Sequence, residues 1–241
     1  MKITYIGHSG FLMEWETCYW LFDYYTGDIP QMDAKKKVFV FVSHKHGDHL
    51  NPKVFDLRHE YRDIEYVLSS DIEQPQGDGV FGHIIYVEPA KRYELRDGHH
   101  ETVRLTTLKS TDLGVAFLLN YLGKTVYHAG DLNLWVWKEE TKQYNDDMTA
   151  AFNEQMAHLK DHLNGTAIDV AFVPLDPRQE EYYYMGLDSL LSTAKVKTVF
   201  PMHFGKEFSV IERYKKERAA SPHGTVIVNV DRAGQEWEID L

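Results

Sequence analysis

Three histidines and an aspartate are concentrated in one short stretch of this 241-residue chain, which reads His44-Lys45-His46-Gly47-Asp48-His49. Side chains alternate along an extended backbone, so His44 and His46 project to the same side and can hold one ion through their imidazole nitrogens, as in zinc sites. Asp48 and His49 follow a glycine in a turning segment and point in different directions, which suits a second ion. The spacing therefore predicts two neighbouring metal ions.

The segments on either side of this cluster predict that it lies on a loop between a strand and a helix. The apolar run 38–42 reads as a buried strand, and Asn51 and Pro52 are residue types favoured at the N-cap and first position of a helix. Functional sites are often built on loops held by such elements. A histidine-rich surface tract without function is disfavoured, because random placement would not put the cluster between these two signals.

With three further segments, the cluster makes the chain similar to the metallo-β-lactamase-fold hydrolases, whose signature is H-x-H-x-D-H. The segments follow the order used in that family and are Lys2 to Leu12, Tyr127-His128-Ala129-Gly130-Asp131 and Pro201-Met202-His203-Phe204-Gly205. The resemblance spans nearly the whole chain. Within the family, the chain is similar to the branch that includes ascorbate-6-phosphate lactonases and many bacterial hydrolases of unassigned substrate.

The resemblance implies the remaining members of the site. Asp131 is expected to bridge both ions, His203 to bind the second ion, and His8 to face the site mouth, where it would act with Asp48 in catalysis. Asp23 matches an acid that could hold an imidazole N–H outside the ligand shell. From the residues alone, Asp131 and Asp23 also read as ordinary turn aspartates, and His8 as a hairpin histidine without a role.

One position departs from the family pattern. The family offers a third imidazole to the first metal between the strands near Leu105 and Phe117, and this chain has no histidine there. Asp112 lies in that segment and is expected to replace the imidazole as an oxygen ligand, giving a harder site that suits manganese or iron as well as zinc. Alternatively, fewer protein groups hold the first ion and Asp112 caps a turn.

Several other residues near these segments have two open interpretations. His128 is expected to be a core histidine, because strand alternation points it away from Asp131. Trp135 and Trp137 are interpreted either as a wall of the substrate pocket or as packing between a helix and a sheet. Lys109 or Arg178 is the expected local group for an anionic substrate, although the segment around Arg178 also reads as a surface turn.

The length and the hydrophobic content of 43% predict one domain over residues 1–241. Strands are predicted at 2–6, 11–15, 17–23, 38–42, 65–68, 83–88, 92–96 and 102–107 in a first sheet, with a helix at 52–59. A second sheet takes strands at 115–120, 125–129, 169–173, 197–200 and 225–230, with helices at 146–163, 187–194 and 207–219. The expected fold is α/β, a four-layer αβ/βα sandwich of two facing mixed sheets.

The formal charge of −11 disfavours nucleic acid and anionic membrane surfaces as partners. Residues 1–15 alternate polar and apolar types, which indicates neither a secretory signal nor a membrane anchor, so a cytoplasmic protein is expected. The sequence is also compatible with a homo-oligomer. The single cysteine, Cys18, lies in a strand-like segment and is expected to be buried and inert.

The expected activity is that of a metal-dependent hydrolase. Two divalent ions, with zinc the first expectation, would lower the pKa of a bound water and provide a metal-bound hydroxide. That hydroxide would attack a small ester, lactone or phosphodiester. A non-catalytic metal-binding scaffold of the same fold is the alternative, because of the missing histidine. The di-iron flavoprotein oxidoreductases of this fold need a carboxylate where His46 stands and a flavin domain, so they fit poorly.

Overall fold

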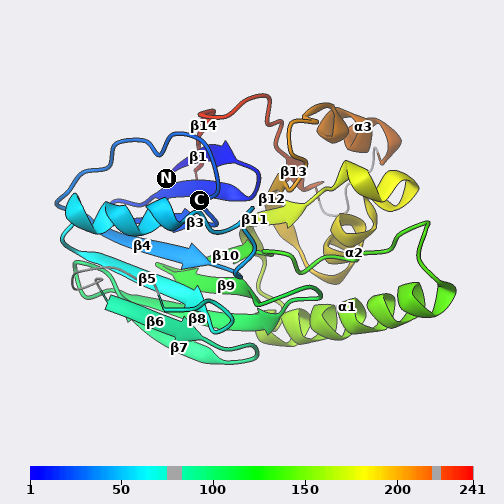
Figure 1. The fold of residues 1–241 in the computed structure, drawn as a ribbon, viewed down its shortest axis with the longest axis horizontal. Coiled ribbons are helices and arrows are strands. Elements are labelled where there is room, and N and C mark those ends of the chain that lie inside the picture. The colour runs from blue at the N-terminus through cyan, green and yellow to red at the C-terminus, as the bar shows by residue number, and fades with distance from the viewer. Residues whose placement is uncertain (75–82, 219–223, 241) are drawn as a thin grey trace.

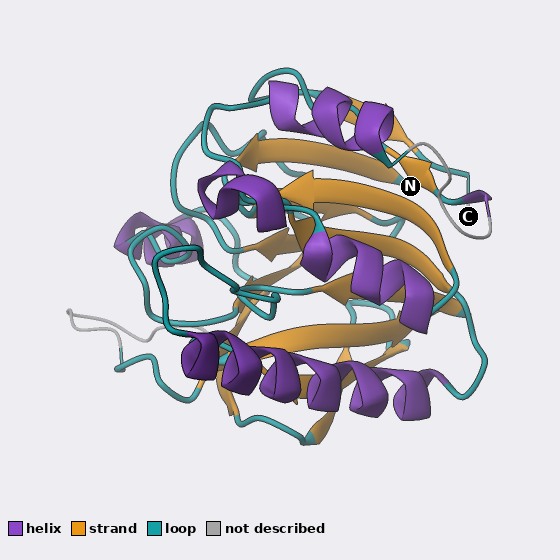
Figure 2. Ribbon diagram, turned by 90° about the vertical axis from the view of Figure 1, so that its right-hand side faces the viewer, coloured by secondary structure: helices purple, strands orange, loops and turns teal. Residues whose placement is uncertain are grey.

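Two seven-stranded sheets face each other in the computed structural model, which describes residues 1–74, 83–218 and 224–240 (Figure 1). The strand orders are β14-β1-β2-β3-β4-β5-β6 and β13-β12-β11-β10-β9-β8-β7. Helices pack on the outer faces, and Figure 2 shows several of them lying across one sheet. This arrangement confirms the predicted four-layer sandwich.

The first sheet combines an antiparallel and a parallel half. Its strands are β1 (Lys2–Gly7), β2 (Gly10–Glu14), β3 (Cys18–Phe22), β4 (Lys37–Val42), β5 (Ile64–Ser69), β6 (His83–Val87) and β14 (Glu236–Glu238). Strands β3 to β6 run parallel, whereas β14, β1, β2 and β3 pair antiparallel. The predicted helix at 52–59 is a 3-10 helix, η1 (Pro52–His59), and Asn51 caps it by accepting from the amide of Lys53.

The second sheet has the same composite character. Its strands are β7 (Arg92–Arg96), β8 (Thr102–Lys109), β9 (Val115–Tyr121), β10 (Lys124–His128), β11 (Ile168–Pro174), β12 (Val196–Met202) and β13 (Val226–Ile227). The helical elements are α1 (Lys142–Leu163), η2 (Pro177–Tyr182), α2 (Met185–Thr193) and α3 (Ser209–Glu217). Thr141 begins α1 by accepting from the amide of Tyr144, and left-handed Asn164 ends it.

The sheet assignment of two predicted strands was wrong. The strands at 92–96 and 102–107 were expected in the first sheet, but β7 and β8 belong to the second, where both pair antiparallel in one meander with β9. Short turns join these three strands, and a short turn forces consecutive strands to pair with each other. In addition, the strand expected at 225–230 is reduced to β13, and β14 was not predicted.

The core lies between the two sheets and is rich in aromatic rings. Phe22 stacks on Phe41 with ring centroids 5.0 Å apart, and Phe11 and Phe172 meet across the interface at 4.4 Å. Cys18 is buried here as predicted, and burial raises the pKa of its thiol to about 12. Burying this apolar surface is the dominant favourable contribution to folding. None of the helices in the described ranges combines the length and the apolar character needed to cross a membrane.

The topology brings four strand ends to one edge of the sandwich. Strands β10, β11 and β12 are parallel neighbours, so their carboxyl ends lie side by side, and β4 ends opposite them in the other sheet. The residues that follow these ends are His44, Asp131, Asp176 and His203. Ligand sites of sheets with parallel strands form outside the carboxyl ends of the strands, so this edge is where a site is expected.

Candidate metal centre

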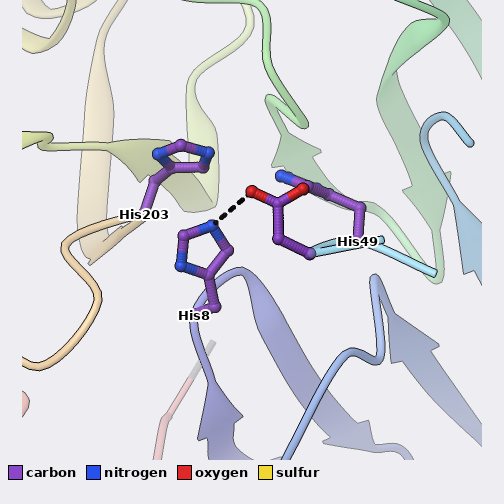
Figure 3. Close-up of side chains that lie close together, drawn as sticks. His8, His49 and His203 are labelled. Atoms are coloured by element: carbon purple, nitrogen blue, oxygen red, sulfur yellow. Dashed lines mark ion pairs between the residues drawn. The ribbon is translucent and has the colours of Figure 1, made fainter. Parts of the chain in front are cut away.

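The side chains predicted to bind metal, together with the predicted catalytic residue His8, lie in two adjacent groups at this edge. The first group is His44, His46, Asp112 and Asp131, and the second is His8, Asp48, His49 and His203. Within each group, one possible ligand atom from each residue lies within 4.8 Å of all the others. Figure 3 shows that members of the second group converge from separate segments of the chain. The structure thus brings together all the residues that were predicted to bind metal or to act in catalysis.

Asp131 lies between the two groups. Its Oδ2 is 3.4 Å from His44 Nε2, and its Oδ1 is 3.1 Å from His49 Nε2 and 3.3 Å from His203 Nε2. The turn before it requires Gly130, because the backbone φ is +52° and a Cβ there would lie 2.6 Å from the Cβ of Ser43. The carboxylate is therefore held where each oxygen faces a different group.

A buried carboxylate holds His49 from behind. Asp23 Oδ2 accepts from His49 Nδ1 at 2.8 Å, and the two oxygens of Asp23 also accept from the amide and hydroxyl of Ser43 at 2.7 Å. Burial lowers the pKa of His49, but the carboxylates of Asp131 and Asp23 outweigh burial and raise this pKa to about 10. This contact leaves Nε2 of His49 directed at Asp131, as outer-shell carboxylates do for metal-ligating histidines.

A second buried carboxylate does the same for His203. Asp176 Oδ2 lies 2.9 Å from His203 Nδ1, and Arg178 Nε donates to both oxygens of Asp176 at 2.9 and 3.0 Å. Burial raises the pKa of Asp176, but the hydrogen bonds from His203 and Arg178 outweigh it and lower the pKa to about 2. Asp176 is thus a charged partner that orients the imidazole of His203 toward Asp131.

The first group is more open to solvent. His44 is fully buried, with Nδ1 3.0 Å from the hydroxyl of Ser43, whereas the side chains of His46 and Asp112 are 43% and 42% exposed. Asp112 Oδ2 lies 3.3 Å from His46 Nδ1, at the position where the family pattern offers an imidazole. Gly114 permits this approach, since a Cβ there would lie 2.0 Å from the carbonyl oxygen of Ser43.

The donor set fits metal ions. Two atoms that each lie about 2.0–2.1 Å from one zinc ion in tetrahedral geometry are about 3.3 Å apart. The pairs His44–His46, His46–Asp112 and His44–Asp131 are 3.0, 3.3 and 3.4 Å apart. In the second group, the buried atoms His49 Nε2, Asp131 Oδ1 and His203 Nε2 have no hydrogen-bond partner among the described residues. These atoms face one another, so a cation between them would satisfy all three.

His8 and Asp48 lie at the open side of the second group. His8 Nε2 is 3.4 Å from Asp48 Oδ2, and the His8 ring centroid is 4.2 Å from that of His203 (Figure 3). The adjacent imidazole of His8 holds the pKa of Asp48 well below its usual range, and burial lowers the pKa of His8. Both His8 and His203 have left-handed backbones, with φ of +54° and +65°. Strained backbone of this kind is concentrated at functional sites.

A cavity of about 270 Å³ opens directly over both groups. Its floor includes Asp48 and Asp131, and its sides include Trp135, Trp137 and Arg178. Both tryptophans thus line the pocket, and Trp135 is also packed into the protein, being 6% exposed. Lys109, the other expected anion-binding group, is not part of the lining.

Asp176 was not predicted as a partner of His203, because its segment was interpreted as a surface turn. The signal was present, because Asp176 follows buried strand β11 at the same edge as Asp131 and His203. The interpretation of His128 as a core histidine agrees with the structure. Its Nδ1 accepts from the amide of Gly130 at 3.1 Å, so its Nε2 donates to the carbonyl of Ser9 at 3.0 Å.

Comparisons with known proteins identify a matching family, similar sequences and a similar fold. Residues 2–148 match the family described as the β-lactamase superfamily domain. A UPF0173 metal-dependent hydrolase of Heliobacterium modesticaldum is 28% identical over 229 residues, covering 88% of this chain and 86% of that protein. One of Bacillus pumilus is 27% identical, covering 99% and 100%. The solved structure of Igni18, a metallo hydrolase of Ignicoccus hospitalis, has a TM-score of 0.67 at 17% identity, covering 99% of both chains. That last likeness shows a shared fold.

Proposed function

Because the chain belongs to the metallo-β-lactamase superfamily, we propose that it is a metal-dependent hydrolase of small esters, lactones or phosphodiesters. The observation that carries the proposal is the convergence of three buried ligand atoms, from His49, Asp131 and His203, that make no hydrogen bond to any described residue. Buried polar atoms without partners are costly, and they persist where an ion or a catalytic role accounts for them. The relatives named metal-dependent hydrolases support the same class of activity.

We assign the ligands to two ions according to the two groups. The first ion would be held by His44, His46, Asp112 and Asp131, and the second by Asp48, His49, His203 and Asp131. Imidazoles and carboxylates suit zinc, and the additional oxygen of Asp112 makes manganese or iron acceptable at the first position. When bound, a pair of divalent ions supplies Lewis-acid polarisation and lowers the pKa of a water.

The protein's own residues provide orientation and proton handling around that chemistry. Asp48 lies at the cavity floor with its pKa held low, so it stays ionised and can orient the attacking water by accepting a hydrogen bond. His8 Nε2, 3.4 Å from Asp48, is placed to pass a proton toward the leaving group. Asp23 and Asp176 keep His49 and His203 in the orientation that ligation needs.

A non-catalytic metal-binding scaffold is the second candidate, and one observation favours it. His46 and Asp112 are nearly half-exposed, and no family imidazole completes the first group. A weak first site would leave one ion in the protein and no paired centre. Elemental analysis of purified protein separates the candidates: close to two ions per chain is expected for the hydrolase, and one or none for the scaffold.

The activity test uses zinc-loaded protein with panels of lactones, phosphodiesters and acyl esters. We expect a small molecule rather than nucleic acid to be the substrate, given the net charge of −11. Hydrolysis should be lost in Asp131→Asn, because this substitution removes the charge shared by the two groups. Asp63→Asn, at an exposed carboxylate, is the matched control. Full activity in Asp131→Asn, or in protein stripped of metal, would overturn the proposal.

A further inference from the structure

One side of the cavity is an aromatic wall. The rings of Trp135 and Trp137 are nearly parallel, at 4°, with centroids 5.9 Å apart, and Trp135 also lies 5.3 Å from the ring of His203. Tyr144, from the first turn of α1, extends this wall and is 39% exposed. Flat apolar faces beside the polar side chains that line the same cavity offer a stacking surface for a flat group on a ligand.

The wall is held firmly in place by two amide side chains, of Gln179 and Asn145. Gln179 is 2% exposed, and its Nε2 donates to the carbonyls of Leu134 and Val136 at 2.7 and 3.2 Å. Asn145 of α1 binds both backbone groups of Trp137, accepting from its amide at 3.0 Å and donating to its carbonyl at 2.8 Å. A surface fixed in this way loses little conformational entropy when a ligand binds.

Arg178 provides positive charge beside this wall. It is the one arginine or lysine among the described residues that line the cavity, and its side chain is 63% exposed. Its pairing with Asp176 uses Nε and Nη2, so the Nη1 donors are not committed to that carboxylate. Divalent ions would offset the aspartates on the floor, and the loaded cavity would then favour a negatively charged ligand.

We propose that the substrate carries both a flat apolar group and a negative charge. The flat group stacks on Trp137 and Tyr144, the charge pairs with Arg178, and the scissile ester, lactone or phosphodiester lies over Asp48 and Asp131. The cavity volume of about 270 Å³ limits the flat group to one or two rings. This inference rests on the proposed hydrolase function and specifies the substrate class of the same site.

Binding of three non-reacting probes to zinc-loaded protein tests this subsite by isothermal titration calorimetry. Naphthalene-2-carboxylate has both features, cyclohexanecarboxylate lacks the flat ring, and naphthalene-2-carboxamide lacks the charge. We expect the first probe to bind about tenfold more tightly than either of the others. Trp137→Leu should remove the preference for the flat ring, and Arg178→Gln should reduce the preference for charge. Arg178→Lys should retain most of the charge preference.

Matched controls remove comparable side chains far from the cavity. Tyr86→Leu removes an exposed aromatic ring on β6, and Arg104→Gln removes an exposed arginine on β8, so neither should change the binding of any probe. Metal content is measured for every variant, because Arg178 also contacts Asp176. Equal binding of the three probes, or unchanged preferences in both Trp137→Leu and Arg178→Gln, would overturn the inference even if ester hydrolysis is observed. Intact probe preferences without any hydrolysis would support the subsite and count against the proposed function alone.

Discussion

His49 and Asp131 face each other at 3.1 Å through two buried atoms, Nε2 and Oδ1, that lack hydrogen-bond partners in the described structure. The opposite nitrogen of His49 is engaged by Asp23, so the ring cannot rotate to satisfy Nε2 without losing that contact. Oδ1 of Asp131 also lies 3.3 Å from Nε2 of His203, and a cation placed between these three atoms would satisfy all of them. We therefore expect the stability of the fold to depend on the binding of a cation.

Removal of metal is expected to lower the melting temperature. A ligand at about 100 times its dissociation constant stabilises a protein by about 2.7 kcal/mol, which corresponds to a shift of about 5–10 °C for a chain of this size. Differential scanning calorimetry of chelator-treated protein, before and after zinc is added back, measures this shift. Identical melting temperatures in the two states would contradict the assignment of the buried atoms to a cation.

Asp23→Asn is expected to weaken metal binding without a change in any proposed ligand. The amide keeps the shape of the side chain but loses the charge that holds His49 Nδ1 at 2.8 Å. Loss of such an outer partner lowers metal affinity by roughly 10–100-fold. Competition with a chromophoric chelator measures the affinity, with Asp63→Asn as the exposed control. An affinity equal to that of the parent protein would show that Asp23 has no such role.

The features that the sequence predicted best depend on residues close together in the chain. The close spacing of His44, His46, Asp48 and His49 identified the site, because all four follow one strand end. The pairing of Asp176 with His203 was missed because it depends on β11 and β12 lying parallel, so that two residues 27 positions apart come together. Periodicity shows that a segment is a strand, but it does not name the partner of that strand.

The same reason accounts for the misplaced strands. The β-branched and aromatic content of 92–96 and 102–107 identified β7 and β8 correctly. Their place beside β9 is set by the turns around Gly98 and Gly114, which that content does not reveal. The positions of Asp131 and His203 in the site came from the family resemblance. Without the resemblance, Asp131 reads as an ordinary turn residue at the end of a strand.

Asp48→Ala is expected to lower turnover by more than ~100-fold while the fold survives, because Asp48 belongs to the proposed centre. Its side chain is 42% exposed, so truncation removes little packing. Hydrolysis rates on the best substrate of the panel, together with circular dichroism, check the two parts of this prediction. Unchanged turnover would reject the role of Asp48.

Asp97 is expected to make stability depend on acid pH. Burial raises its pKa, but hydrogen bonds from Tyr121 at 2.6 Å and Thr17 at 2.7 Å outweigh burial, so the folded pKa is lowered. The stabilisation is therefore fully present above the unfolded pKa of about 3.9 and is lost as pH falls through the lower folded pKa. Urea unfolding at pH 7 and pH 3 measures the free energy of unfolding of the parent protein and of Asp97→Asn. This free energy should fall less between the two pH values in the variant than in the parent. Equal decreases in the two proteins would contradict this assignment.

Asp112→His restores the imidazole that the family pattern has at this position, and it tests whether Asp112 is a ligand. Asp112 Oδ2 lies 3.3 Å from His46 Nδ1, so a nitrogen donor introduced here would join the same group. Replacement of an oxygen ligand by imidazole favours zinc over manganese. We expect the ratio of zinc to manganese affinity to rise about tenfold or more, as measured by competition titration. Asp112→Ala should instead weaken the binding of zinc and of manganese at the first site. If neither substitution changes metal affinity, Asp112 only caps its turn, and the first ion is held by His44, His46 and Asp131.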